Sequence, residues 1–329
     1  MNRVSDFMLQ LSKDLIDQRK ITESSAQLYI KNLWTLNDKK IFNNLAFLKE
    51  IDNIETKLSE YADNTKKTFL AGIVSVLSLF KDKPSYKKTY QHYYDAMMKK
   101  DEEIKENVDP NQKTEKEEEN WLSWEDVILV KTALKTASNE LNKQKLITPE
   151  QYNVVLSYVI LSLYTEIPPR RNQDYQDMFV ISSLKDSGDK EKNYLDWSNK
   201  KFIFNHYKTA KKYGIQTIDI SDKPDLLEAI TIYLKFHPLS PSKGKALPKN
   251  AEFRFLVYSD GGAFSAVNSI TRILNRIFGG KRIGSSQLRH IYLSSKYDIE
   301  EMKKDAEEMG HSIEEQKQYL KAPSKSNII

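Results

Sequence analysis

The sequence contains no cysteine. This absence excludes disulfides, thiolate catalysis and cysteine-based zinc sites, and it fits a reducing compartment such as a cytoplasm or nucleus. The five histidines are scattered and none forms a His-x-x-x-His pair, so we expect neither a metal site nor a cofactor. No stretch approaches the ~18 consecutive apolar residues of a membrane span, and the N-terminus lacks the apolar core of a signal peptide. We therefore expect an intracellular protein without a membrane partner.

The sequence also lacks an internal repeat, a P-loop and a dinucleotide-binding fingerprint. Its net charge of +5 is unevenly distributed. Residues 1–100 carry 17 basic and 12 acidic side chains, residues 101–120 carry 3 and 9, and residues 121–329 carry 31 and 25. Two basic regions therefore flank an acidic connector. Basic domains suit a polyanion such as DNA, because each neutralised phosphate releases counterions, although lysine also serves solubility alone.

A chain of 329 residues is long enough for two domains. Residues 1–97 have helical apolar spacing throughout, with one helix expected after an N-cap at Thr22 and another over Lys66–Phe80. They predict a compact helical domain. Residues 98–120 are charged, nearly free of apolar side chains and interrupted by Pro110, which is typical of a flexible or partly helical linker.

Residues 121–329 form the second expected domain. Ser123 is expected to cap a helix, and an apolar helix over Tyr152–Tyr164 breaks at Pro168-Pro169. Further helices are expected over Pro224–Phe236 and Ser265–Phe278, the latter with Val267 facing inward.

A strand pair is expected over Phe202–Phe204 and Ile215–Ile220, with a third strand over Met178–Ile181. The connection between the paired strands carries Lys208, Lys211 and Lys212. The fold class expected for the whole chain is mainly α with a small antiparallel sheet. It combines a helical N-terminal domain with a mixed α/β domain.

The C-terminal stretch gathers residue types suited to phosphate chemistry. Apolar residues at helical spacing predict a helix that directs Arg289 and His290 inward. A second helical run over Asp298–Met309 stops at a glycine, so His311 follows in a turn. Tyr319 comes eight residues later in a polar segment, with no apolar face to join.

This stretch resembles the C-terminal half of the tyrosine recombinases (phage integrase family). Their motif reads His-x-x-Arg-His, then Leu-Gly-His, then a nucleophilic tyrosine, and the matching residues here are Ser286-Gln287-Leu288-Arg289-His290, Gly310-His311 and Tyr319. The resemblance covers Trp121 to Tyr319 well. The first hundred residues match the family's core-binding domain only loosely, through Thr22, Tyr29 and Leu33. In two departures, Ser286 replaces the first histidine and the His311 to Tyr319 interval is short.

The resemblance implies a site-specific recombinase or integrase that cleaves and rejoins double-stranded DNA as a homotetramer. The reaction passes through a covalent 3′-phosphotyrosine and needs neither metal nor ATP. The implied catalytic residues are Arg171, Lys208, Arg289, His311 and Tyr319, with Arg170, Ser286 and His290 as supporting or alternative residues. Arg171 is preferred over Arg170 because Asp174 follows it by three positions, but the prolines leave that register open. Lys211 and Lys212 remain rivals of Lys208.

Two other functions remain open. A type IB topoisomerase uses similar residues, but the interval from its second arginine to its histidine is longer than Arg289 to His311. A catalytically inactive DNA-binding relative would explain the basic regions and Ser286. The lysine- and asparagine-rich composition indicates an AT-rich genome, such as that of a virus or mobile element.

Overall fold

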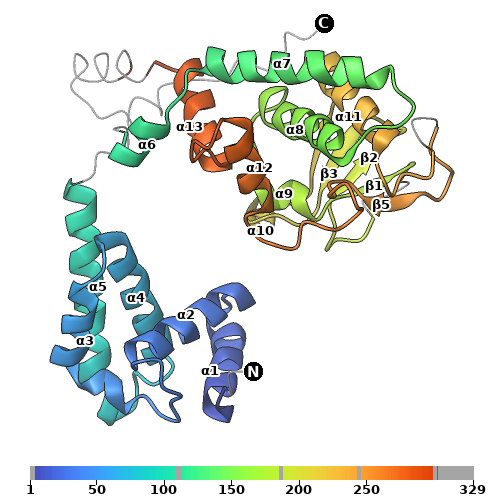
Figure 1. Ribbon diagram of the computed structural model, residues 1–329. Coiled ribbons are helices and arrows are strands. Elements are labelled where there is room, and N and C mark those ends of the chain that lie inside the picture. Colours follow the sequence, from blue (N-terminus) through green and yellow to red (C-terminus); the bar gives the residue numbers. More distant parts are fainter. Residues whose placement is uncertain (1–3, 108–112, 185–187, 243–245, 299–301, 303–329) are drawn as a thin grey trace, which may run out of the picture. The chain divides into compact units, whose positions relative to one another are not determined.

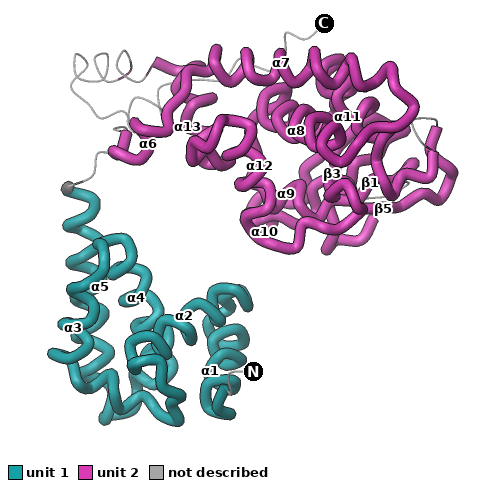
Figure 2. The backbone as a smooth tube through the Cα atoms, in the orientation of Figure 1, with its two compact units in different colours: residues 1–112 teal, residues 113–329 magenta. Residues whose placement is uncertain are grey.

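The computed structural model of the protein describes residues 4–107, 113–184, 188–242, 246–298 and 302. The chain divides into two compact units, Met1–Gln112 and Lys113–Ile329 (Figure 2). The boundary falls inside the acidic segment 98–120. In the described part of the chain, no helix has both the length and the apolar character needed to cross a membrane.

Unit 1 is helical throughout its described secondary structure (Figure 1). Its elements are α1 (Asp6–Arg19), α2 (Glu23–Leu36), the 3-10 turn η1 (Ala46–Lys49), α3 (Ile51–Ser59), α4 (Asp63–Leu77) and α5 (Pro84–Asn107). The side chain of Thr22 accepts a hydrogen bond from the N–H of Ser25, so the predicted N-cap of α2 is confirmed. Apolar side chains of α1, α2 and α4 form the core, with Leu15, Leu33 and Ile73 fully buried.

Helix α5 continues into the segment expected to be a linker. Asp101 pairs with Lys67 of α4, and Lys100 Nζ lies 3.4 Å from a carboxylate oxygen of Asp63. These ion pairs tie the charged end of α5 to its neighbour. Residues 98–107 are therefore helical despite their polar composition, and charged side chains make their contacts with α4.

Unit 2 is organised around the buried helix α8, which packs between α7 and α11 (Figure 1). Its helices are α6 (Glu115–Asn120), α7 (Trp124–Asn142), α8 (Pro149–Thr165), α9 (Asn172–Gln176), α10 (Ala210–Tyr213), α11 (Pro224–Phe236), α12 (Ser269–Ile277) and α13 (Ser285–Lys296). Ser123 caps α7 as predicted, in a reciprocal capping box with Asp126. Helix α12 begins later than expected, and Val267 lies before it, 73% exposed, so its predicted inward position is wrong.

Unit 2 also contains a five-stranded sheet in the order β4-β3-β2-β1-β5. The strands are β1 (Phe179–Ile181), β2 (Tyr194–Asp196), β3 (Lys201–Phe204), β4 (Gln216–Asp219) and β5 (Glu252–Arg254). The predicted antiparallel pair is present as β3 and β4. However, β1 pairs with β2 in parallel, so the sheet is mixed and the wholly antiparallel expectation is wrong. Its apolar residues join the core beneath α8 and α11 through Phe202 and Phe204.

Candidate active site

A cleft of about 240 Å³ opens in unit 2 where three segments meet. These are the break between α8 and α9, the connection between β3 and β4, and helix α13. The lining residues are Pro169, Arg170, Arg171, Asp174, Tyr207, Thr209, Tyr213, Gln216 and Arg289. Three arginines and one carboxylate give the cleft an excess of positive charge. It brings together arginines that are more than a hundred residues apart in the sequence.

The break between α8 and α9 places two of these arginines. Helix α8 ends at Thr165, and the following Pro168-Pro169 pair cannot continue it because proline lacks the backbone donor. Arg171 then has an extended backbone and occupies the N-cap position of α9. The prolines therefore end the buried helix α8 just before Arg170 and Arg171, which then line the cleft.

Arg170 is bound within the protein. Its Nε donates to Asp174 Oδ2 at 2.8 Å, and one terminal nitrogen donates to Gln216 Oε1 at 2.8 Å. Its guanidinium carbon lies 3.8 Å from the centroid of the Phe204 ring. These contacts join the α8–α9 break to β3 and β4. Arg170 thus holds the cleft together.

Asp174 is the buried partner of this ion pair, with a side chain only 3% exposed. Its Oδ1 is buried and makes no hydrogen bond to any described residue. Burial raises the pKa of Asp174, against the opposing effect of the nearby guanidiniums, of which Arg170 is the strongest. Among the described residues, the ion pair of Asp174 is with Arg170, so the register expected from the spacing of Arg171 and Asp174 does not correspond to an ion pair. Neighbouring side chains in an extended segment diverge, and it is Arg170 that reaches the carboxylate.

Arg171 and Arg289 present their charge to the cleft. Among the described residues, no hydrogen bond or ion pair engages the guanidinium of Arg171. In the described part of the chain, the Arg289 side chain bonds only within its own helix, from Nε to the Ser285 carbonyl at 3.1 Å and from a terminal nitrogen to Ser286 Oγ at 3.3 Å. Burial and the charge of Arg171 lower the pKa of Arg289. Two like charges held together in this way are arranged to bind an anion.

Ser286 and His290 flank Arg289 on α13 but differ in what they contact. Ser286 is exposed and accepts a hydrogen bond from Arg289. His290 is 56% exposed, and its Nδ1 lies 2.7 Å from Glu117 Oε1 on α6. His290 does not line the cleft, and the prediction that it points inward is wrong. It lies on the exposed side of α13, one position from the half-buried Arg289.

The connection between β3 and β4 forms the third wall. Lys208 is exposed and stands between Tyr207 and Thr209, which both line the cleft. The hydroxyl of Tyr207 donates to the carbonyl of Gly214 at 2.7 Å and so closes this connection across α10. Gly214 has φ +67°, a conformation that favours glycine. Lys208 is not itself a lining residue of the cleft but lies between two that are, and its rivals Lys211 and Lys212 lie on α10.

The predicted residues His311 and Tyr319 lie outside the described residues. Besides Tyr207 and Tyr213, which line the cleft, two tyrosines on or next to α13 are described. Tyr292 packs edge to face on Trp124 with ring centroids 5.2 Å apart, and Tyr297 is 54% exposed at the end of α13. Sequence reasoning missed the roles of Gln216 and Phe204 in holding Arg170. Both lie more than 30 positions from Arg170 in the sequence, so no local pattern indicates these contacts.

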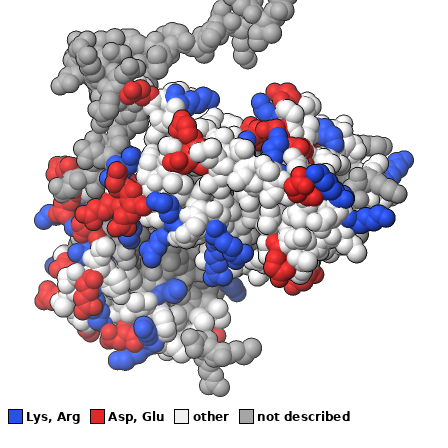
Figure 3. All heavy atoms as spheres, turned by 45° about the horizontal axis from the view of Figure 1, so that its top comes forward, with Lys and Arg blue, Asp and Glu red and all other residues white. Residues whose placement is uncertain are grey.

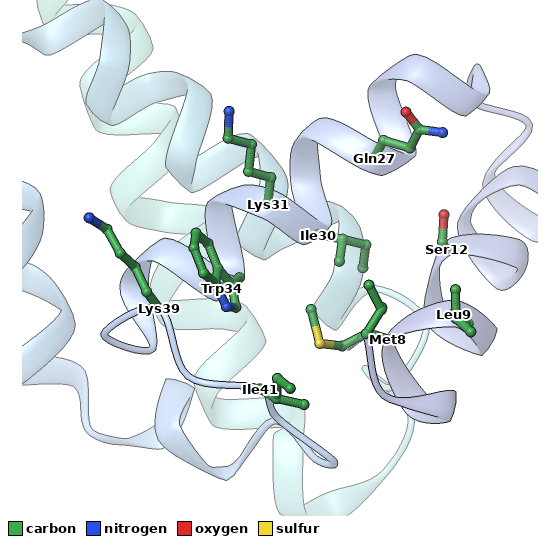
Figure 4. A pocket seen from close by; sticks show the side chains of 10 residues that line it. Met8, Leu9, Ser12, Gln27, Ile30, Lys31, Trp34, Lys39 and Ile41 are labelled. Carbon is green, nitrogen blue, oxygen red and sulfur yellow. The ribbon is translucent and has the colours of Figure 1, made fainter. Parts of the chain in front are cut away.

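A second cavity of about 560 Å³ lies between α1 and α2 of unit 1 (Figure 4). Apolar side chains, including Met8, Ile30 and Trp34, line most of it, and Lys31 and Lys39 stand at its edge. It contains no carboxylate, histidine or arginine. Within the described residues, no group of acidic, histidine or cysteine side chains is arranged to hold a metal ion. The arginine-rich cleft is therefore the better candidate for chemistry on an anion.

Acidic and basic side chains lie interspersed over the face of the molecule in Figure 3. The cleft is distinguished by three arginines that line it together, and not by an extended basic surface. Comparisons with protein-family models, with curated proteins and with solved structures find no match.

Proposed function

We propose that the protein is a tyrosine-type site-specific DNA recombinase that cleaves and rejoins strands through a covalent 3′-phosphotyrosine. The observation that carries this proposal is the convergence of Arg171 and Arg289 in one cleft. Neither arginine is neutralised by a direct ion pair with a described carboxylate, and the exposed Lys208 lies between the lining residues Tyr207 and Thr209. Such a site suits a phosphodiester, which is anionic and has two non-bridging oxygens.

The proposed mechanism assigns phosphate binding to the two arginines. A guanidinium is always charged and can donate to two oxygens at once, so Arg171 and Arg289 would hold the non-bridging oxygens as negative charge develops. Preorganised donors of this kind contribute about 3 kcal/mol each to transition-state stabilisation. Arg170 acts as a positioning residue, because its bonds to Asp174 and Gln216 fix the backbone that carries Arg171.

Proton transfer and nucleophilic attack fall to the remaining residues. The hydroxyl of Tyr319 attacks the phosphorus, and the bond to the leaving 5′ oxygen breaks. Lys208 gives that oxygen a proton as general acid, and His311 accepts the tyrosine proton. The phosphotyrosine conserves the bond energy, so a 5′ hydroxyl can reverse the reaction without ATP. We further propose that the protein works as a homotetramer on paired duplex sites.

Covalent capture on a suicide substrate tests this function. The substrate is a pool of duplexes of randomised sequence, each nicked so that a short 5′-hydroxyl fragment diffuses away after cleavage. A recombinase will retain a protein–DNA adduct through denaturing electrophoresis, and sequencing will find a preferred site among the captured duplexes. Capture without sequence preference, together with relaxation of any supercoiled plasmid, would instead indicate a topoisomerase. Binding without an adduct would indicate an inactive relative.

A further inference from the structure

The acidic helix α6 contacts the chain beside the cleft, within unit 2. The Nζ of Lys281 donates to the carbonyl of Glu119 at 3.1 Å, and the backbone N–H of Arg282 donates to Asn120 Oδ1 at 2.6 Å. The third contact joins Glu117 to His290, the residue next to Arg289 on α13. Helix α6 therefore lies against the segment 281–290, which carries basic side chains up to the edge of the cleft.

Glu117 links the folding of α6 to this contact. Its Oε2 accepts hydrogen bonds from the backbone N–H and the hydroxyl of Thr114, which completes the capping box of α6. Its Oε1 is left for His290 at 2.7 Å. The bonds from Thr114, and after them the one from His290, hold the pKa of Glu117 below its ordinary value. The residue facing His290 is thus a stably ionised carboxylate.

The contact is polar and shallow, and one of its three bonds, Glu117 to His290, joins two ionisable side chains. Helix α6 carries four glutamates and one lysine, and none of its residues is buried. Contacts between exposed charged groups are individually weak and are screened by salt. Helix α6 can therefore detach from the segment 281–290 without exposing buried apolar side chains. The carboxylate of Glu117 lies against His290, the neighbour of Arg289, on the surface that a phosphate backbone arriving at Arg289 would approach.

We propose that α6 is an acidic cover that competes with DNA phosphates for the surface formed by Lys281, Arg282 and His290. This inference rests on the proposed function, since it makes α6 a regulator of DNA access to the same cleft. Duplex DNA displaces the cover because it presents a denser row of negative charge to Lys281 and Arg282. In the free protein α6 is bound to the segment 281–290, and in the DNA-bound protein it is detached from that segment.

A reversible crosslink tests the cover in the full chain. The sequence has no cysteine, so the double variant Glu117→Cys, His290→Cys offers a single pair for a short bis-methanethiosulfonate crosslinker that a reductant removes. The probe is a fluorescent random-sequence duplex, and the measurement is its anisotropy at low salt before and after reduction. The control is Lys192→Cys, Glu252→Cys, an exposed ion pair at 3.0 Å on the side of the sheet away from β4.

We expect the crosslinked Glu117/His290 variant to bind the duplex at least ten-fold more weakly than the same protein after reduction. The control pair should bind equally in both states. A second variant, Glu117→Gln, should bind more tightly than wild type without any crosslink. Equal affinity in the crosslinked and reduced states would overturn the cover alone. Failure of every form to bind duplex DNA would overturn the proposed function as well.

Discussion

Arg170 donates from Nε to Oδ2 of Asp174 at 2.8 Å, and the side chains of the pair are 15% and 3% exposed. The pair is built into the protein interior, so it is a structural contact at the edge of the cleft. It also separates the roles of two adjacent arginines. Arg170 holds the segment in place, whereas Arg171 is available to a ligand.

This difference predicts that Arg170→Ala will destabilise unit 2 while Arg171→Ala will not. Removing one partner of a buried ion pair typically costs about 3 to 5 kcal/mol, because the other charge is left without compensation. Arg171 makes no such pair among the described residues, so its removal should change the free energy of unfolding by less than about 0.5 kcal/mol. Urea denaturation followed by circular dichroism measures both. Equal losses in the two variants would contradict the assignment.

The destabilisation by Arg170→Ala should depend on pH. Burial raises the pKa of Asp174 above its ordinary value of 3.8, and Arg170 is the strongest of the groups opposing that rise. In the variant the pKa therefore rises further. A carboxyl with a raised folded-state pKa costs nothing below its unfolded pKa, where it is neutral in both states, and weakens the fold as pH rises. Because the unfolded state is common to both proteins, the difference in unfolding free energy should grow as pH rises from the folded-state pKa of Asp174 in wild type, which lies above 3.8, to the higher one in the variant. A flat difference between pH 4 and 7 would show that Asp174 is not the group left unpaired.

Arg171→Lys and Arg289→Lys should separate binding from chemistry. Lysine keeps the charge but cannot donate to two phosphate oxygens in a fixed plane, so duplex affinity should stay within a few-fold. The rate of covalent capture should fall by about 100-fold or more in each case. Single-turnover capture and fluorescence anisotropy provide the two readouts. If Arg170→Lys loses capture with its stability intact while Arg171→Lys retains capture, the two arginines have exchanged roles.

Ser286→Ala tests whether a hydroxyl suffices where the family motif has histidine. Ser286 Oγ accepts a bond from Arg289 at 3.3 Å, so it orients the guanidinium and is a positioning residue. Losing one such bond should slow capture by about two- to ten-fold, without changing duplex affinity. Ser286→Thr keeps a hydroxyl and should restore most of the rate. Loss as severe as that of Arg289→Lys would mean that Ser286 acts on the phosphate itself.

Local sequence signals predicted much of the fold. The caps at Thr22 and Ser123 and the limits of α11 follow from residues a few positions apart, and each is present. The strands β2 and β5 were missed because three residues are too few to show alternation and, unlike β1, neither is an uninterrupted apolar run. Their pairing, including the parallel β1–β2 contact, depends on distant segments.

In the candidate site too, local signals were predictable and long-range contacts were not. Arg171, Lys208 and Arg289 were chosen from the sequence, and the structure places the two arginines in one cleft, with Lys208 between two residues that line it. The partners of these residues could not be predicted in the same way. The bond from Arg170 to Gln216 spans 46 positions and the contact from His290 to Glu117 spans 173, so neither leaves a trace in local spacing.

The proposed reaction is tested most directly by identifying the residue that becomes attached to DNA. After capture on the selected site, protease and nuclease digestion followed by mass spectrometry should place the nucleotide on Tyr319, through a 3′ phosphate. Tyr319→Phe should form no adduct while binding the duplex normally. Tyr292→Phe, which keeps its ring against Trp124, and Tyr297→Phe should form adducts at the wild-type rate. An adduct that survives in Tyr319→Phe, or that maps to another tyrosine, would contradict the proposed reaction.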